Sequence, residues 1–288
     1  MKLGFDPNDF PVEDARTLIR LALAEDVGSG DVTSLWTIPP TQTQTATLIA
    51  KQDGVLAGMA IPALVFEALQ VPMQIVLLKG DGERVQKGDK IATFTGTTQA
   101  LLTGERTLLN FIQQLSGVAS VARKYADALQ GGCTQVLDTR KTIPSFRRLQ
   151  KYAVRAGGGS NHRMGLHDMV LVKDNHIEAA GGVLPALAMV QRHNTHKLKI
   201  EMEVESLAQL RSLLHKGVDV IMLDNMDDAT MGEAVQIVRD SKDPVQLEAS
   251  GNMDLERVRR IAKLGLDYIS VGALTHSVQA LDISMRIL

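Results

Sequence analysis

The sequence has one cysteine, few aromatic residues and no long apolar run, and each shortage excludes a class of protein. A lone Cys133 can form neither an internal disulfide nor a zinc site built from several cysteines. Aromatic residues make up 3% of the chain, too few for the stacking platform of a single-strand nucleic-acid binder. No apolar run is long enough to span a membrane, and the first residues lack the apolar core of a signal peptide. We therefore predict a cytoplasmic protein without membrane or nucleic-acid partners, and a buried Cys133 ahead of the apolar pair Val136–Leu137.

The chain is nearly neutral overall, but its positive charge is concentrated in one segment. The formal net charge is −2, whereas polyanion-binding domains are usually strongly basic. Between Arg140 and Lys173 a single acid, Asp168, accompanies eight basic residues: Arg140, Lys141, Arg147, Arg148, Lys151, Arg155, Arg163 and Lys173. The spacing of Arg147, Arg148, Lys151 and Arg155 is typical of the exposed face of a helix. The remaining four flank apolar or glycine-rich stretches, which favours a site for a small anion.

The first part of the chain contains two clear helical patterns around a β-rich stretch. Residues 11–25 and 101–130 repeat apolar positions at helical spacing, the second as one continuous stripe. Between them, residues 43–96 form short β-like runs, with Asp53-Gly54 and Asp81-Gly82 as hairpin signals. We predict a β-containing subdomain that a long helix joins to the C-terminal half of the chain.

After Gly131 a repeating unit of strand and helix begins. The spacing of these units predicts either an α/β barrel or an open parallel sheet. The expected strands are 135–138, 169–173, 199–205, 219–225, 244–250 and 267–273, and the expected helices include 176–192, 206–216, 228–240 and 254–264.

Each expected strand ends in polar residues or glycine. Because the active sites of α/β barrels form at the carboxyl ends of the strands, six such ends predict a pocket. The residues are Asp138 to Lys141, Lys173 to Asn175, Glu201 and Glu203, Asp224 and Asn225, Ser250 and Gly251, and Gly272.

The expected pocket has a basic and an acidic half. Arginine and lysine suit carboxylate or phosphate ligands, and the basic half contains Arg140, Lys141, His162, Arg163 and Lys173. Glu203 and Asp224, with Glu201 and Asp174 nearby, can hold Mg²⁺ or ribose hydroxyls or stabilise a cationic sugar. The backbone N–H groups at Ser250, Gly251 and Gly272 can bind phosphate. An ion pair between an inward-facing glutamate and a lysine is the structural alternative.

Long motifs in the sequence resemble the quinolinate phosphoribosyltransferase family. They are DTRKTIP, GGGSNHRMGLHDMVLVKDNHI, EVES, MLDNM, EASG and SVGALTHS. The resemblance implies an α/β sandwich domain, here 1–112, followed by an incomplete α/β barrel, here 113–288. A last helical stretch is expected to return to the N-terminal domain. It also implies a homodimer that needs Mg²⁺ and converts quinolinate and phosphoribosyl pyrophosphate to nicotinate mononucleotide, pyrophosphate and CO₂ in NAD biosynthesis.

The resemblance also implies roles for individual residues. Glu203 and Asp224 match carboxylates at the ribose and metal, and Lys141 matches a catalytic lysine near the pyrophosphate. Ser250, Gly251 and Gly272 match phosphate-binding strand ends. Residues matching the quinolinate site are Arg140, His162, Arg163 and Lys173, with Arg106 from the partner subunit.

Three other functions agree with the residues. Lys173 at a strand end is a possible Schiff-base nucleophile of a class I aldolase. The same pocket suits a non-catalytic protein that binds phosphorylated metabolites. The third alternative is an enzyme of the same fold that uses another acceptor.

Overall fold

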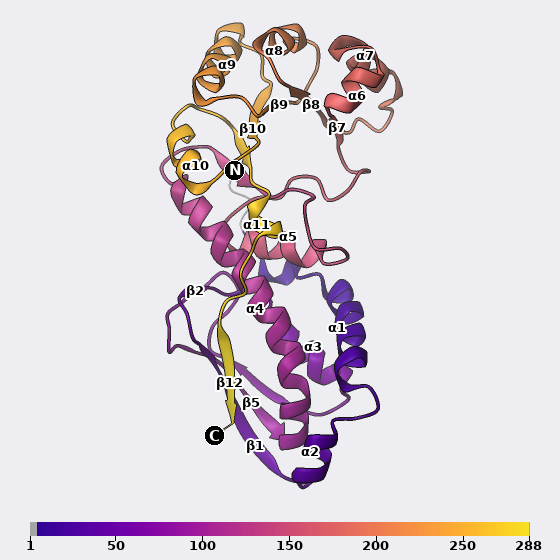
Figure 1. Cartoon of the computed structure of the whole chain (residues 1–288), viewed down its shortest axis with the longest axis vertical. Coiled ribbons are helices and arrows are strands. Elements are labelled where there is room, and N and C mark those ends of the chain that lie inside the picture. Colours follow the sequence, from indigo (N-terminus) through magenta and orange to yellow (C-terminus); the bar gives the residue numbers. More distant parts are fainter. Residues whose placement is uncertain (1–4, 288) are drawn as a thin grey trace. The chain divides into compact units, whose positions relative to one another are not determined.

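The computed structural model describes residues 5–287, which fall into two compact units (Figure 1). The first unit contains the chain up to Arg123, residues Thr142–Gly158 and the segment from Ser277 onward. The second contains Lys124–Lys141 and Gly159–His276. The division differs from the boundary expected after residue 112, which lies inside the continuous helix α4 (Thr98–Ala128).

The first unit is built on a four-stranded antiparallel sheet. Its order is β12-β1-β5-β3, with β12 at Ile283–Ile287, β1 at Thr43–Ala50, β5 at Lys90–Thr97 and β3 at Gln74–Leu77. The prediction of a final helical stretch is therefore wrong. Ile283 and Met285 are buried while Ser284 and Arg286 are more exposed, the two-residue period of a half-buried strand.

Helices cover this sheet, and two short strands complete the unit. Phe66 of α3 (Ile61–Ala68) and Phe94 of β5 pack with their ring centroids 5.8 Å apart. On α4, the predicted apolar stripe is buried from Leu108 to Ala122. The elements are η1 (Pro7–Asp9), α1 (Val12–Val27), α2 (Val32–Thr37), α3 (Ile61–Ala68), α5 (Arg147–Ala156), β2 (Gly54–Val55) and β4 (Arg84–Val85), together with most of α4.

Helix α5 carries basic residues but is mostly buried. Lys151 has no exposed surface, so its expected place on a solvated helix face is wrong, whereas Arg148 is exposed. The neighbouring Tyr152 hydroxyl donates a hydrogen bond of 2.5 Å to Asp81. Burial raises the pKa of the Asp81 carboxyl despite that bond. The spacing of the basic residues did not predict which face of α5 is buried.

Two helical glycines offer a matched test of packing. At Gly117 in α4 a methyl group would overlap the backbone oxygen of Gln279, whereas at Gly232 in α9 (Asp228–Ser241) the nearest atom would be 3.7 Å away. We expect Gly117→Ala to lower the free energy of unfolding by about 1–3 kcal/mol through overpacking. Gly232→Ala should raise it by up to about 1 kcal/mol, because alanine favours helix. Urea denaturation of both variants checks this, and equal effects would contradict the packing argument.

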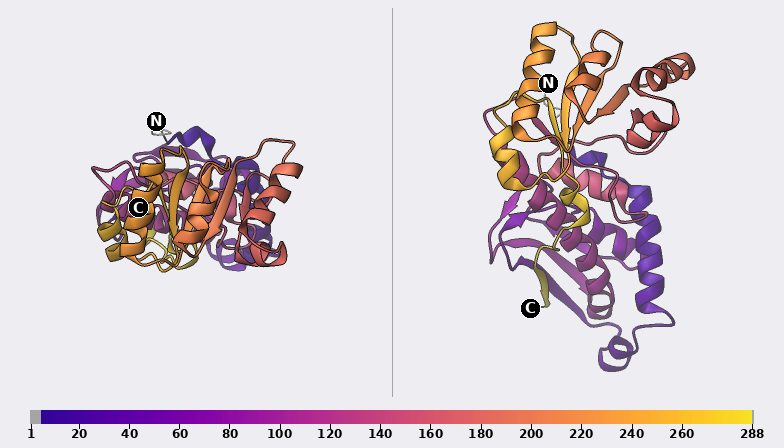
Figure 2. Two further views of the ribbon diagram at one scale, coloured as in Figure 1. Left: turned by 90° about the horizontal axis from the view of Figure 1, so that it is seen from above. Right: turned by 45° about the horizontal axis from the view of Figure 1, so that its top comes forward.

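The second unit is a six-stranded parallel sheet with helices on its outer side (Figure 2). The strand order is β6-β11-β10-β9-β8-β7, so β6 and β7 are the two edges and do not pair. A barrel that stays open between two strands is incomplete, as expected. The strands are β6 (Gln135–Leu137), β7 (Val170–Val172), β8 (Ile200–Val204), β9 (Val220–Asp224), β10 (Gln246–Ser250) and β11 (Tyr268–Ser270).

The helices of this unit follow the predicted ranges with one break. The helix expected over 176–192 is divided at Gly181 and Gly182, whose φ angles of 84° and 130° do not fit a helix. The helices are α6 (Asp174–Ala179), α7 (Val183–His193), α8 (Leu207–Leu213), α9, α10 (Leu255–Ile261) and α11 (Ala273–His276). The predicted α/β fold, with an antiparallel N-terminal sheet and a parallel C-terminal sheet, is confirmed.

The single cysteine does not lie where the sequence predicts. Cys133 is exposed, so the prediction of a buried thiol is wrong: the residue lies before β6 rather than within it. Over residues 5–287, no helix combines the length and the apolar character needed to cross a membrane.

Candidate active site

The strand register of the second unit brings the predicted residues together at the carboxyl ends of neighbouring strands. Ser250 of β10 pairs with Asp224 of β9, and Glu203 of β8 pairs with Met222, two residues before Asp224. Side chains of paired residues point to the same face of a sheet, and the face alternates along each strand. Glu203, Asp224 and Ser250 therefore share the inner face at neighbouring carboxyl ends.

The acidic half of the site meets a lysine. Lys173 follows β7, and its Nζ lies 3.5 Å from Oε2 of Glu203, whose side chain is 7% exposed. Burial raises the pKa of Glu203, Lys173 opposes this rise, and the charges of Asp224 and Asp174 add to it. Two further carboxyl groups thus lie close enough to disfavour the ionisation of Glu203. A bound cation would relieve that repulsion, and oxygen ligands suit Mg²⁺.

Two arginines of the basic half come from different segments of the chain. Arg163 is 9% exposed, and its Nη1 donates to the backbone oxygen of Met169 at 3.1 Å. Burial lowers the pKa of Arg163 and the positive charge of Arg140 lowers it further, while the charges of Glu201 and Asp168 only partly oppose this. Two neighbouring guanidinium groups repel each other unless an anion lies nearby. The arrangement favours a carboxylate or phosphate ligand.

A buried aspartate fixes the segment that carries this basic half. Asp138, at the end of β6, has no exposed surface. Its Oδ1 accepts the backbone N–H of His162 at 3.0 Å, and its Oδ2 accepts the side-chain amide of Asn161 at 2.5 Å. The 161–163 segment is thereby attached to the strand that precedes Arg140.

Lys141 lies against the end of β11. A Cβ atom on Gly272 would be 3.2 Å from Cδ of Lys141, so the glycine allows the lysine chain to pass. The backbone oxygen of Lys141 accepts the hydroxyl of Thr275 at 2.7 Å. The structure thus brings together the ends of β6 and β11, as the pocket prediction requires. Arg106 lies elsewhere in the chain, exposed on α4 in the first unit.

Two glutamates and a histidine form a buried cluster next to Arg163. His162 Nε2 lies 3.0 Å from Glu201 and 3.6 Å from Glu248, and its Nδ1 accepts the backbone N–H of Arg163 at 2.7 Å. The Ser270 hydroxyl donates to Glu248 at 2.5 Å. Burial raises the pKa of Glu201, partly offset by Arg163, and burial with the charge of Glu201 raises that of Glu248, each to about 8.

Family models match nearly the whole chain. The model described as "Quinolinate phosphoribosyl transferase, N-terminal domain" matches residues 31–116, and that of the C-terminal domain matches residues 118–286. The chain belongs to the quinolinate phosphoribosyltransferase family.

Individual members of the quinolinate phosphoribosyltransferase family are similar over full length. The chloroplastic nicotinate-nucleotide pyrophosphorylase (carboxylating) of Arabidopsis thaliana is 40% identical over 306 residues, covering 100% of this chain and 86% of the relative. A probable enzyme of that name from Bacillus subtilis is 42% identical, covering 94% and 93%. The crystal structure of NadC from Streptococcus pyogenes has a TM-score of 0.90 at 39% identity, covering 94% of this chain and 95% of that one.

The buried cluster was only partly visible in the sequence. Glu201 was noted beside Glu203, but Glu248 was missed, although it lies between the apolar Leu247 and Ala249 in an expected strand. An acid at a core position of a strand is a usable signal, because burial of an unpaired charge is disfavoured. The EASG motif of the family resemblance begins at Glu248, but the resemblance implied a role only for its Ser250 and Gly251.

The raised pKa of Glu248 predicts a pH-dependent stability. A carboxyl that keeps its proton up to about pH 8 when folded, but only to about 4.5 when unfolded, stabilises the fold most at low pH. That stabilisation is lost as pH rises from about 4.5 to about 8. Glu248→Gln should remove a decline of up to about 1.4 kcal/mol per pH unit. Urea denaturation at several pH values checks this. The exposed Glu233→Gln is the control, and an unchanged slope in Glu248→Gln would contradict the assignment.

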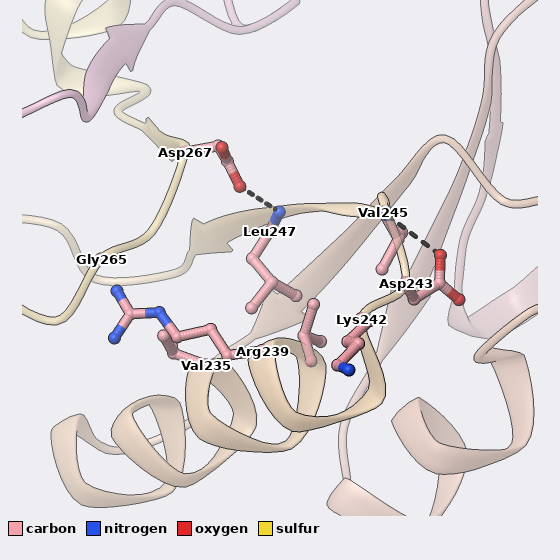
Figure 3. A pocket seen from close by; sticks show the side chains of 9 residues that line it. Val235, Arg239, Lys242, Asp243, Val245, Leu247, Gly265 and Asp267 are labelled. Carbon is pink, nitrogen blue, oxygen red and sulfur yellow. Dashed lines mark hydrogen bonds between the residues drawn. The ribbon is translucent and has the colours of Figure 1, made fainter.

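A separate pocket lies at the opposite edge of the sheet, beside the starts of β10 and β11 (Figure 3). Its two acids are used in holding the strands: Asp267 accepts the N–H of Leu247 at 2.9 Å, and Asp243 accepts that of Val245 at 3.1 Å. In α/β barrels this amino-terminal edge contributes to stability rather than to catalysis. We assign this pocket no part in the quinolinate phosphoribosyltransferase site.

Proposed function

We propose that this chain transfers the phosphoribosyl group of phosphoribosyl pyrophosphate to quinolinate with loss of CO₂, giving nicotinate mononucleotide and pyrophosphate. The observation that carries the proposal is the pairing of a basic half around Arg140 and Arg163 with an acidic half around Glu203 and Asp224 at one edge of one sheet. Membership of the family supports it. Both substrates are anionic, so they require the concentrated positive charge.

In this proposal the basic half binds the two carboxylates of quinolinate. Arg140 and Arg163 offer planar guanidinium groups that suit carboxylates, and Lys173 adds a point charge. His162 is the remaining expected ligand. Its direct contact with a carboxylate would require Nε2 to turn away from Glu201, which lies 3.0 Å away.

The acidic half faces the ribose of the donor. As the bond from the anomeric carbon to pyrophosphate breaks, that carbon gains positive character, which Glu203 and Asp224 are placed to stabilise. The same two residues would hold Mg²⁺, which supplies charge neutralisation for the pyrophosphate oxygens. Ser250, Gly251 and Gly272 offer backbone N–H groups to the phosphate of the donor.

The bond changes balance without an additional redox partner. The pyridine nitrogen forms a bond to the anomeric carbon while pyrophosphate leaves, with Lys141 neutralising the leaving group. The ring then carries a positive charge and accepts the electron pair released when the adjacent carboxylate departs as CO₂. That carbon finally takes a proton from solvent water.

A labelled substrate tests the reaction. We expect release of CO₂ from quinolinate labelled in the carboxyl next to nitrogen, dependent on both phosphoribosyl pyrophosphate and Mg²⁺. Nicotinate as acceptor should give no comparable nucleotide formation. Turnover of nicotinate at the rate of quinolinate would instead favour an enzyme of this fold with another acceptor. Lys173 pairs with Glu203, and among the described residues 5–287 no feature of its surroundings favours the aldolase alternative.

We further propose a cytoplasmic homodimer in which Arg106 completes the partner's site. Support comes from the family resemblance and from the position of Arg106, exposed on α4. Plant relatives carry chloroplastic or mitochondrial names, so cell fractionation decides the location. Mixing inactive Arg106→Ala and Lys141→Ala chains should restore about a quarter of the activity in a refolded dimer, since one site in each mixed dimer is intact. No recovery would contradict the shared site.

A further inference from the structure

Arg257, on α10, connects two turns at the edge of the proposed site. Its Nη1 donates to the backbone oxygen of Gly251 at 2.9 Å, and its Nη2 donates to that of Met226. Its Nε donates to Asp228 at 3.0 Å, and its side chain is 15% exposed. One guanidinium group thus contacts the turn after β9, the turn after β10 and the start of α9.

The two turns that Arg257 contacts are tightly interlocked. Asn225 has a positive φ of 53° and Gly251 one of 94°. The Asn225 N–H donates to the oxygen of Ser250 at 3.0 Å, and a Cβ atom on Gly251 would overlap the Asn225 side chain. Neither turn can shift without moving the other.

This interlocked pair sets the position of a proposed catalytic carboxylate. The side-chain amide of Asn225 donates to Oδ2 of Asp224 at 2.6 Å, so the left-handed backbone at Asn225 orients the aspartate. Asp224 is held from the first turn, and Ser250 and Gly251 belong to the second. The distance between the carboxylate and the phosphate-binding N–H groups therefore depends on how the turns are tied.

We propose that Arg257 is a positioning residue, which holds Asp224 in register with the Ser250–Gly251 turn for binding of phosphoribosyl pyrophosphate. The proposal rests on the proposed function. A guanidinium fork can bind two carbonyl oxygens and a carboxylate at once, whereas a lysine ammonium cannot reproduce this planar geometry. Displacement of a substrate-positioning group by about 1 Å can cost about a hundredfold in rate.

The chain supplies a matched control on the same helix. Arg260 also donates to Asp228, at 3.1 Å, but its side chain is 60% exposed. The hydrogen bonds described for Arg260 reach neither turn. A variant at Arg260 therefore removes one positive charge and one hydrogen bond to Asp228, as a variant at Arg257 does. It leaves the contacts of Arg257 to Met226 and Gly251 in place.

Kinetics of Arg257→Lys, Arg257→Met and Arg260→Gln test the proposal. We expect both Arg257 variants to raise the KM for phosphoribosyl pyrophosphate about tenfold, with the KM for quinolinate changed less than about twofold. Arg260→Gln should match the wild type. Rescue by Arg257→Lys would show that charge alone suffices, and would overturn the proposal. Equal rises in both KM values, together with a lower melting temperature, would indicate a merely structural role and overturn it too.

Hydrogen exchange provides a readout that does not depend on the reaction. We expect faster amide exchange at residues 224–228 and 250–254 in both Arg257 variants than in Arg260→Gln, because the turns lose their shared anchor. Unchanged exchange there would overturn the proposal even if activity fell. If the wild type releases no CO₂ from quinolinate, the proposed function fails, and the exchange result still decides whether Arg257 ties the turns.

Discussion

Replacing Lys141 by alanine is expected to lower turnover by about a hundred- to a thousandfold while the fold stays intact. The lysine is exposed, so its loss leaves no cavity, and the contact of its backbone with Thr275 does not need the side chain. Loss of a group that stabilises developing charge typically costs this much. The effect should fall on kcat, with the KM for quinolinate nearly unchanged, because the pyrophosphate gains charge only as it leaves.

Steady-state kinetics and thermal unfolding of the same preparation check this prediction. Lys216→Ala, at another exposed lysine of the second unit, should behave as the wild type in both. If Lys141→Ala kept more than about a tenth of the turnover, the leaving-group role would be wrong.

Replacing Glu203 by glutamine should produce the second large loss. The change keeps the shape but removes one negative charge from the acidic half and breaks the ion pair with Lys173. We expect a fall in kcat of about a hundredfold, since less charge opposes the positive anomeric carbon. The Mg²⁺ concentration needed for half-maximal activity should rise, because a carboxylate binds Mg²⁺ better than a neutral amide.

A Mg²⁺ titration at saturating substrates measures both effects. Asp224→Asn should behave like Glu203→Gln, whereas Glu205→Gln, an exposed glutamate two residues further on, should resemble the wild type. An unchanged Mg²⁺ requirement in both site variants would contradict a role of the two carboxylates in binding Mg²⁺. The effect on kcat would then test only their role at the anomeric carbon.

The repeating part of the fold could be predicted because its signals are local. Each apolar run after Gly131 forms a strand of the parallel sheet, and each strand lies within a few residues of its expected range. Strand β12 could not be predicted in this way. Its five residues alternate too briefly to be distinguished from a helix, and their partner β1 lies near the other end of the chain. Such a pairing is set by tertiary contacts rather than by local preference.

Those residues of the candidate site that lie at strand ends could be predicted from the sequence. Asp224, Ser250 and Glu203 share one edge, as expected from the rule for parallel strands, and the family resemblance is confirmed. The cluster around Glu248 and the contacts of Arg257 were not predictable, since both depend on which atoms meet between separate segments. For the same reason Lys151 was misplaced: basic residues at helical spacing do not reveal which of them the fold buries.

The pairing of β12 with β1 has a consequence for the order in which the protein matures on the ribosome. Strand β1 is made early, but one of its two neighbours in the sheet belongs to residues 283–287, which are translated after the whole second unit. Until then β1 is a sheet edge with unpaired backbone groups, the kind of edge that recruits foreign strands. This edge of β1 therefore stays open throughout synthesis of the second unit, until residues 283–287 are available to pair with it.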